Sequence, residues 1–221
     1  GKQTEMVCED EAGFFAVLLP GKKIPSYTLI YWDGDGNQME HYDPYAYPMQ
    51  FTEQEQKQFE NGICYSIYEK LGAHPVKIDG VSGVYFAVWA PNALRVSVVG
   101  DFNHWDGRRH QMRRLWDSGI FEIFIPGVRE GENYKFELKL KGGLTYLKAD
   151  PYAFGQQLRP DTASVVRNID GFAWEDEAWI LAREKSCPEK EPMSVYEMYL
   201  GSFAKPEDGR RYYNYREFAP K

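Results

Sequence analysis

One turn of this chain combines aromatic and polar side chains in a pattern suited to an uncharged, ring-shaped ligand. Residues 98–112 read Val-Val-Gly-Asp-Phe-Asn-His-Trp-Asp-Gly-Arg-Arg-His-Gln-Met. The apolar residues before Gly100 predict a strand, and the polar residues after it predict a turn that holds Phe102 and Trp105 three residues apart. If one ring enters the core, the other faces outward. An outward indole can cover the C–H face of a sugar ring while the amide of Asn103 hydrogen-bonds the hydroxyls. A core position for Trp105 is the alternative.

The titratable residues of this turn and of two Asp-Pro pairs have structural interpretations. His104 and His110 are six residues apart on one loop, and we expect them to face solvent rather than to form a metal pair. Asp43 and Asp150 each precede a proline, which is typical of residues that start a turn. The sequence therefore predicts neither a metal site nor a cofactor.

Charge and cysteine content narrow the class of partner. The 221 residues carry a formal net charge of −7, which disfavours nucleic acid and anionic membranes because both attract basic proteins. The longest clear apolar run, residues 14–19, is much shorter than a membrane-spanning helix. The chain has an odd number of cysteines, and they are widely spaced: Cys8, Cys64 and Cys187. This pattern indicates free thiols in a reducing compartment, and we expect a cytoplasmic protein.

Part of the sequence occurs twice. Residues 13–21 (GFFAVLLPG) resemble residues 119–127 (GIFEIFIPG). Tyr27 and the DPYAY that begins at Asp43 recur as Tyr134 and the DPYAF that begins at Asp150, both 107 residues later (134 − 27 and 150 − 43). We therefore predict two copies of one module. The first copy has only twelve residues ahead of its first block, so it is expected to lack its beginning.

Turn residues divide most of the chain into short aromatic and β-branched runs. The alternation of residues 134–140 (YKFELKL) is that of a half-buried strand. Strands are also predicted at residues 27–32, 83–89, 95–99, 120–125, 144–147 and 194–200. Helices are predicted within residues 52–71, 174–185 and 215–219. Short strands at this spacing predict an all-β fold of tandem immunoglobulin-like β-sandwich modules.

Six segments, taken in order, resemble a known family. They are residues 68–74 (YEKLGAH), 83–93 (GVYFAVWAPNA), 100–110 (GDFNHWDGRRH), 134–136 (YKF), 148–154 (KADPYAF) and 159–164 (RPDTAS). Together they resemble the family 48 carbohydrate-binding module of bacterial 1,4-α-glucan (glycogen) branching enzymes. Residues 194–203 (SVYEMYLGSF) are similar to the first strand of the (β/α)8 barrel of family 13 glycoside hydrolases.

The resemblance implies an α-1,4-glucan (glycogen, amylose or malto-oligosaccharides) as ligand and the protein's own catalytic barrel as partner. Glycogen-binding members stack glucose on the tryptophan of the turn, here Trp105. They hydrogen-bond it through the lysine of Tyr-Lys-Phe, here Lys135. The family's second tryptophan has no counterpart, since Leu144 stands near that place with Tyr146 two residues on. The candidate carbohydrate-binding residues are Trp105, Lys135, Asn103 and Tyr146.

The resemblance also implies a parent enzyme that cuts an α-1,4-glucan and transfers the segment to a 6-hydroxyl by retaining chemistry with two carboxylates. In the family those carboxylates lie on later barrel strands. No catalytic residue is therefore assigned here, and the chain alone is expected to be inactive.

The implied domain order places the end of a first sandwich at residues 1–60 and the family 48 module at residues 61–170. A connecting segment at residues 171–193 and the start of the barrel at residues 194–221 follow. Three alternatives remain open: a debranching or trehalose-releasing relative with the same module, a glycogen-targeting module without catalysis, and a structural spacer.

Overall fold

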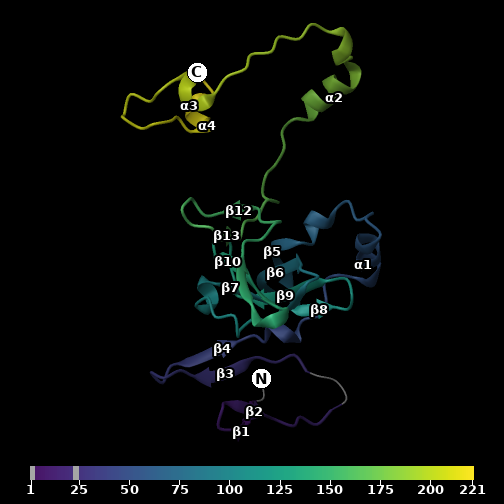
Figure 1. Cartoon of the computed structure of the whole chain (residues 1–221), viewed down its shortest axis with the longest axis vertical. Helices are drawn as coiled ribbons and strands as arrows, with labels where there is room; N and C mark the ends of the chain where they lie inside the picture. Colours follow the sequence, from purple (N-terminus) through teal and green to yellow (C-terminus); the bar gives the residue numbers. More distant parts are fainter. Residues whose placement is uncertain (1–2, 22–24) are drawn as a thin grey trace. The chain divides into compact units, whose positions relative to one another are not determined.

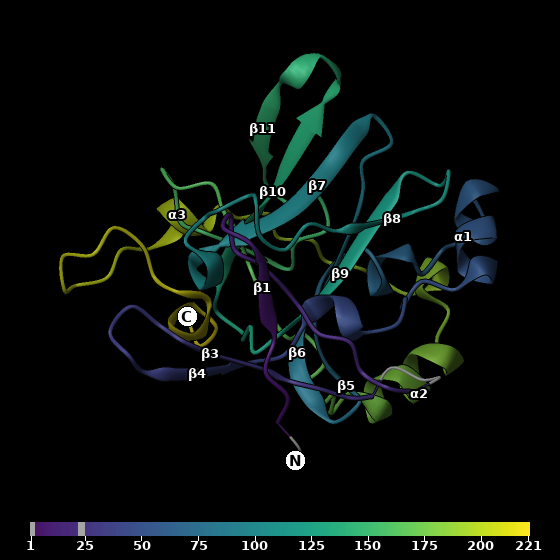
Figure 2. The ribbon, with the colours of Figure 1, turned by 90° about the horizontal axis from the view of Figure 1, so that it is seen from below.

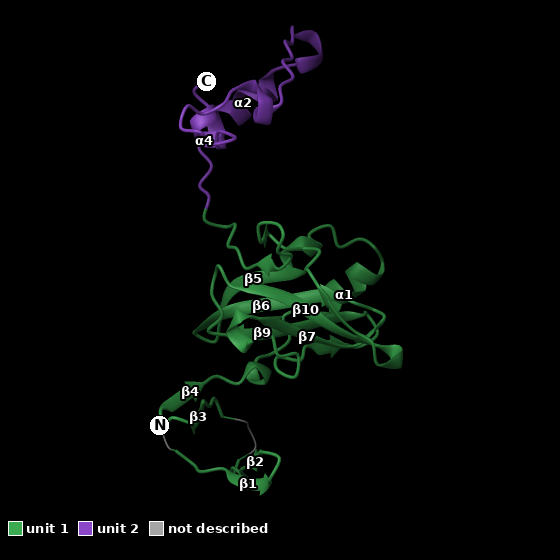
Figure 3. Ribbon diagram, turned by 60° about the vertical axis from the view of Figure 1, so that its left-hand side comes forward, with its two compact units in different colours: residues 1–171 green, residues 172–221 purple. Residues whose placement is uncertain are grey.

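The computed structural model describes residues 3–21 and 25–221, in two units that meet at Gly171 and Phe172 (Figures 1 and 3). The strands are β1 (Val7–Asp10), β2 (Phe14–Ala16), β3 (Leu29–Trp32), β4 (Gln38–His41), β5 (Gly72–Ile78), β6 (Val81–Trp89), β7 (Ala93–Gly100), β8 (Arg113–Leu115), β9 (Ile120–Pro126), β10 (Asn133–Leu140), β11 (Thr145–Lys148), β12 (Gly155–Gln156) and β13 (Ser164–Val165). The helices are α1 (Glu53–Glu60), α2 (Glu177–Lys185), α3 (Leu200–Phe203) and α4 (Tyr215–Phe218). The predicted all-β class is confirmed.

Two antiparallel sheets form the sandwich of the first unit. One sheet has the order β5-β6-β9-β8. In the other, β10 pairs with β7 along one edge and with β11 and β13 along the other, and β12 pairs with β13. Figure 2 shows β7 beside β10, and β11 folding back from the end of β10. The predicted strands at residues 83–89, 95–99, 120–125, 134–140 and 144–147 are all present. The sequence missed β5, an edge strand that contains Pro75, because proline counts against a strand except at a sheet edge.

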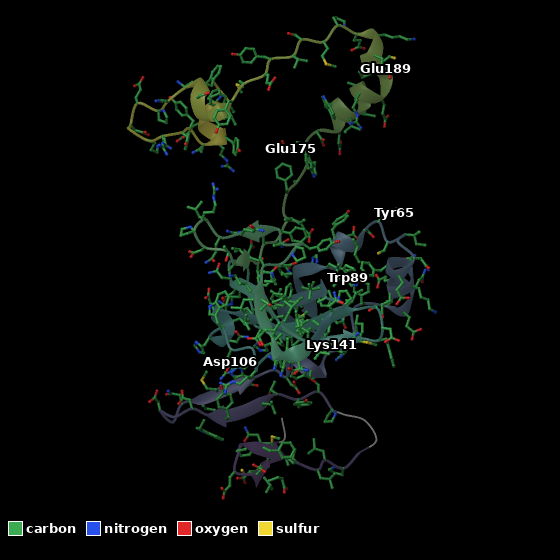
Figure 4. All side chains as sticks on the ribbon, in the orientation of Figure 1. Tyr65, Trp89, Asp106, Lys141, Glu175 and Glu189 are labelled. Atoms are coloured by element: carbon green, nitrogen blue, oxygen red, sulfur yellow. The ribbon has the colours of Figure 1, made fainter. Side chains whose placement is uncertain are left out.

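Side chains crowd the interior of the sandwich (Figure 4), and those between the sheets come from alternate residues of the facing strands. The main core combines residues of β6, β7, β9 and β10: Val84, Phe86, Val88, Val96, Val98, Phe121, Ile123, Ile125, Tyr134 and Phe136. A second cluster lies on the outer face of β6 and β9, where Tyr85, Ile120 and Phe124 pack against Tyr47 and Phe51. Strand β9 is therefore buried on both faces, which explains its nearly continuous apolar sequence.

The one charged residue of β9 joins this outer cluster to the segment that covers it. Glu122 is 3% exposed. Its carboxylate accepts from the backbone N–H of Gln50 at 3.2 Å and of Phe51 at 3.1 Å, and from the Tyr85 hydroxyl at 2.9 Å. Burial raises the pKa of Glu122, and these hydrogen bonds with nearby Arg113 oppose that rise. Glu122 thus fixes residues 47–51 to the sandwich just before α1 begins.

The predicted repeat is visible in the strand register. The hairpin β3–β4 pairs Leu29 with His41, Ile30 with Glu40, Tyr31 with Met39 and Trp32 with Gln38. Adding 107 to each number gives the four pairs of β10–β11, from Phe136 with Lys148 to Lys139 with Thr145. In the described residues, the first copy consists of the two-stranded sheets β1–β2 and β3–β4.

The repeated tyrosine and aspartate form the same contact in both copies. The Tyr27 hydroxyl donates to Asp43 at 2.5 Å, and the Tyr134 hydroxyl donates to Asp150 at 2.6 Å. Each aspartate also accepts from the backbone N–H two residues on, at 2.8 Å. The prediction that both aspartates start a turn is confirmed, and the tyrosine contact adds a reason for the repeat. The contact is exposed in the first copy and buried in the second.

The second unit contains α2, α3 and α4, so the helices predicted at residues 174–185 and 215–219 are present. Residues 194–199 form no strand, and the segment predicted as a strand ends in the helical turn α3. A strand needs a neighbouring strand to satisfy its backbone groups, and within the described residues this segment has none. No helix of the described residues is long and apolar enough to span a membrane.

Candidate functional site

The turn after β7 is built around a buried asparagine. Asn103 is 1% exposed. Its Oδ1 accepts from the backbone N–H of Gly100 at 2.9 Å, and its Nδ2 donates to the Val98 carbonyl at 2.8 Å and to His110 Nδ1 at 2.9 Å. The amide is therefore fully engaged within the turn. The structure places this predicted sugar-binding residue beneath the turn, where it holds the turn's shape.

His110 faces the interior of the turn, contrary to the expectation that it lies in solvent. Its Nδ1 faces the Asn103 Nδ2 donor, so Nδ1 must act as the acceptor. Burial, followed by the nearby positive charge of Arg109, lowers the pKa of His110 to about 4. A neutral His110 therefore belongs to the folded turn. Within residues 3–21 and 25–221, no group of three or more histidine, cysteine or acidic residues could hold a metal ion.

Trp105 stands at the surface of this turn, with 37% of the residue exposed. Phe102, the other ring of the motif, packs against the core beside Phe86. The indole Nε1 of Trp105 donates to Asp101 Oδ1 at 3.0 Å, and Asp101 Oδ2 accepts from Asn133 Nδ2 at 2.8 Å. As expected from the sequence, one ring points inward and the other outward: Phe102 packs against the core, and Trp105 lies at the surface. An outward indole with a tethered edge can present a flat apolar face to a ligand.

Lys135 shares the outer face of β10 with Asn133. Both residues alternate with Tyr134 and Phe136, whose side chains enter the core. The Lys135 ammonium donates to the Thr162 hydroxyl at 2.7 Å. Because an ammonium has three donors, this contact leaves Lys135 capacity to hydrogen-bond a ligand. The chain of contacts from Trp105 through Asn133 places Lys135 on the same side of the sheet as the indole.

Tyr146 lies on the opposite side. It pairs with Leu138, whose side chain packs against the core, and directly opposed residues of an antiparallel pair share a face. Its neighbour Leu147 pairs with Glu137, which lies on the outer face with Lys135. Leu147 is 52% exposed. The structure therefore brings Trp105 and Lys135 to one face, separates Tyr146 from them, and adds Leu147 as an apolar residue that sequence reasoning missed. The sequence could have revealed Leu147 through the repeat, because the register of the repeated hairpin and the alternation along β10 and β11 assign each residue to a face.

An apolar groove of about 330 Å³ opens elsewhere, at one end of the sandwich. Its lining includes Trp89, which Figure 4 labels, with Leu138, Leu140 and Lys148. Neither Trp105 nor Lys135 lines it. A site that stacks a sugar on an exposed ring needs no deep cavity, so we place the candidate site at Trp105, whose indole is partly exposed and held by Asp101.

Comparisons with known proteins identify a family model that matches the segment containing this turn. Residues 70–153 match the family of carbohydrate-binding module 48 (isoamylase N-terminal domain). These residues include Trp105, Lys135 and Leu147. A solved pullulanase from Bacillus acidopullulyticus is 24% identical, covers 44% of this chain and 12% of its own, and gives a TM-score of 0.36.

Curated relatives extend the similarity beyond the module. The 1,4-alpha-glucan branching enzyme GlgB of Synechococcus sp. (strain JA-3-3Ab) is 45% identical over 96% of this chain and 30% of its own length. The GlgB of Gloeobacter violaceus (strain ATCC 29082 / PCC 7421) is 54% identical over 74% of this chain and 22% of its own. The GlgB of Protochlamydia amoebophila (strain UWE25) is 42% identical over 95% of this chain and 28% of its own length. This chain thus spans less than a third of the length of these relatives. Residues 70–153 thus match carbohydrate-binding module 48, and most of this chain is similar to part of the bacterial 1,4-alpha-glucan branching enzymes.

Proposed function

We propose that the outer face of the β7–β10 sheet binds an α-1,4-glucan through Trp105. The observation that carries this proposal is the tethered, outward indole in a segment that matches carbohydrate-binding module 48, with Lys135 on the same side of the sheet. The ring supplies an apolar surface for the C–H face of a glucose unit, and Lys135 donates hydrogen bonds to its hydroxyls. Leu147, exposed on the same face, provides a second apolar surface for the next unit along the chain.

The chemistry of this face suits a neutral polymer better than a charged one. Arg95 on the same sheet is already paired with Glu137 at 2.6 Å, and Arg108 is paired with Asp106 at 2.8 Å. Asp106 is labelled in Figure 4. Lys135 and Lys139 alternate along β10 with Glu137 between them on the same face, so the charges there are of mixed sign and leave no purely cationic surface of the kind that nucleic acid prefers.

For the whole protein we propose 1,4-α-glucan branching in glycogen biosynthesis, in a cytoplasmic setting. Support comes from the identity with branching enzymes over most of this chain. The module's role is to hold glucan and to position a catalytic barrel, which supplies the two carboxylates of the retaining reaction. The same barrel is the alternative occupant of the Trp105 face, in which case the module acts as a spacer.

Replacing Trp105 tests the binding proposal. Trp105→Ala removes the apolar face and is expected to weaken glucan binding by about 1–3 kcal/mol, the value of burying one large apolar side chain. Affinity electrophoresis through gels containing glycogen measures the retention. Trp179→Ala removes another exposed tryptophan, on α2, and should be retained like the wild type. Equal retention of Trp105→Ala and the wild type would reject the proposed site.

A further inference from the structure

The backbone that carries Trp105 has an unusual conformation. His104 and Trp105 have φ angles of 58° and 60°, a left-handed region that costs energy for residues other than glycine. Two successive residues in this region direct the Trp105 side chain out of the turn. The Trp105 N–H donates to the Gly100 carbonyl at 3.0 Å, which fixes its main chain. The main-chain contacts leave the rotation of the indole about its own bonds undetermined.

The contacts of Asp101 fix that rotation. Its Oδ1 accepts from the indole Nε1 at 3.0 Å, and its Oδ2 accepts from Asn133 Nδ2 at 2.8 Å. Asn133 is the first residue of β10. Lys135 lies two residues further along the strand and therefore on the same face. The carboxylate thus connects the indole edge to the strand that carries Lys135. An indole rotated by half a turn would direct its N–H away from Asp101 and lose this bond.

We propose that Asp101 is a positioning residue of the glucan site, which sets the plane of the Trp105 ring relative to Lys135 without contacting the sugar through its charge. This inference rests on the proposed function, because it assigns the part that orders the same binding face. A ring held in the bound orientation does not lose its rotational freedom when the ligand binds, which strengthens affinity. Asp101 acts as an acceptor for two donors, so an asparagine can replace it only by accepting from the indole through its oxygen while its NH2 group donates to a rotated Asn133 amide.

The variants Asp101→Ala and Asp101→Asn separate the two possible roles. Asp101→Ala removes the acceptor and is expected to weaken maltoheptaose binding by roughly three- to tenfold, the cost of ordering one side chain. Asp101→Asn keeps an oxygen for the indole and an amide that can pair with Asn133 once the Asn133 amide rotates, so its affinity should stay within about twofold of wild type. Asp117→Ala removes an exposed aspartate from the β8–β9 turn and serves as the charge control, with affinity unchanged.

The indole N–H signal of Trp105 in a ¹H–¹⁵N spectrum supplies a readout that needs no ligand. It is assigned by its loss in Trp105→Phe. In Asp101→Ala the signal should shift and its hydrogen should exchange faster, while in Asp101→Asn and Asp117→Ala it should stay near the wild-type position. Thermal unfolding of each variant shows whether the fold is intact.

The outcomes distinguish this inference from the proposed function. Weak binding by Asp101→Ala with near-normal binding by Asp101→Asn, matched by the indole signals, supports positioning by an acceptor. Wild-type affinity in a folded Asp101→Ala overturns it, even if Trp105→Ala still loses binding. Equal weakness of Asp101→Asn and Asp101→Ala also overturns it, because the negative charge would then be the required property. If the wild type itself does not bind maltoheptaose, the proposed function fails, although the indole signals still report whether Asp101 orders the ring.

Discussion

At the scale of single residues, three polar contacts give the Trp105 turn its shape. Asn103 has its orientation set by the donor of Gly100 and the acceptor of Val98. Its Nδ2 therefore faces His110 as a donor, and a protonated His110 would oppose it with a second donor. The folded turn thus requires a neutral His110, whose pKa is lowered to about 4 by burial and by Arg109.

The free energy of unfolding should consequently decrease as the pH falls and His110 becomes protonated. Its folded pKa of about 4 lies below the unfolded value of 6.5, so the contribution is complete above pH 6.5 and is lost as the pH falls toward 4. The shift corresponds to roughly 2–3 kcal/mol at pH 4, allowing for partial exposure of the ring. The variant His110→Asn keeps an acceptor near the Nδ1 position but does not titrate. Urea unfolding between pH 4 and 7 should show wild type losing more stability than His110→Asn, and parallel pH profiles would contradict this explanation.

Residue types alone identified only part of the site. The sequence singled out Trp105 as a tryptophan on a polar turn, and the family resemblance added Lys135. It placed Asn103 among the ligand contacts because an amide on a turn looks the same whether its side chain points into the turn or out of it. Asp101 was missed because its role depends on Asn133, which is 32 residues away along the chain.

At the scale of elements, Glu122 links β9 to the segment before α1. Removing the carboxylate leaves two backbone N–H groups and the Tyr85 hydroxyl without their acceptor. Glu122→Ala is therefore expected to lower the free energy of unfolding by about 2–4 kcal/mol, and Glu122→Gln by less, because its amide oxygen still accepts. Chemical denaturation measures both. The exposed Glu130→Ala should change stability by less than about 0.5 kcal/mol. A Glu122→Ala variant as stable as Glu130→Ala would show that the carboxylate does not hold this segment.

The repeated tyrosine–aspartate contact offers a matched comparison. Tyr134 and Asp150 are 0% and 2% exposed, whereas Tyr27 is 37% exposed. Removing the hydroxyl of Tyr134 leaves Oδ2 of the buried Asp150 without its donor, so Tyr134→Phe should cost about 1–3 kcal/mol of stability, and Tyr27→Phe less than about 0.5 kcal/mol. Thermal and urea unfolding of the two variants provide the values. Similar losses in both would mean that burial does not determine the value of this contact.

The element scale is where sequence reasoning succeeded most. The offset of 107 residues predicted a shared hairpin, and the paired registers of β3–β4 and β10–β11 agree at all four positions. The same register could have separated Tyr146 from Leu147, since a shift of one residue moves a side chain to the other face. Residues 47–51 were not assigned to the second sandwich, because their contacts with Glu122 and β9 span more than 70 residues.

At the scale of the whole molecule, a two-layer sandwich carries the proposed glucan site on one outer face. The core between the sheets fixes β7 and β10, and these strands fix the turn of Trp105 and the position of Lys135. The segment at residues 194–200 shows the limit of local sequence patterns at this scale. Its residues have the composition of a strand, but strand formation depends on a neighbouring strand that the described residues do not provide.

Isothermal titration of the chain with maltoheptaose tests the central claim most directly. The claim is that the face bearing Trp105 binds α-1,4-glucan. Wild type should give a saturable binding isotherm, and Trp105→Ala should bind at least about fivefold more weakly, as expected from a loss of 1 kcal/mol or more. Cellohexaose, a β-linked glucan, serves as the control ligand. The absence of saturable binding to maltoheptaose by a folded wild-type chain would contradict the claim and leave the module as a spacer.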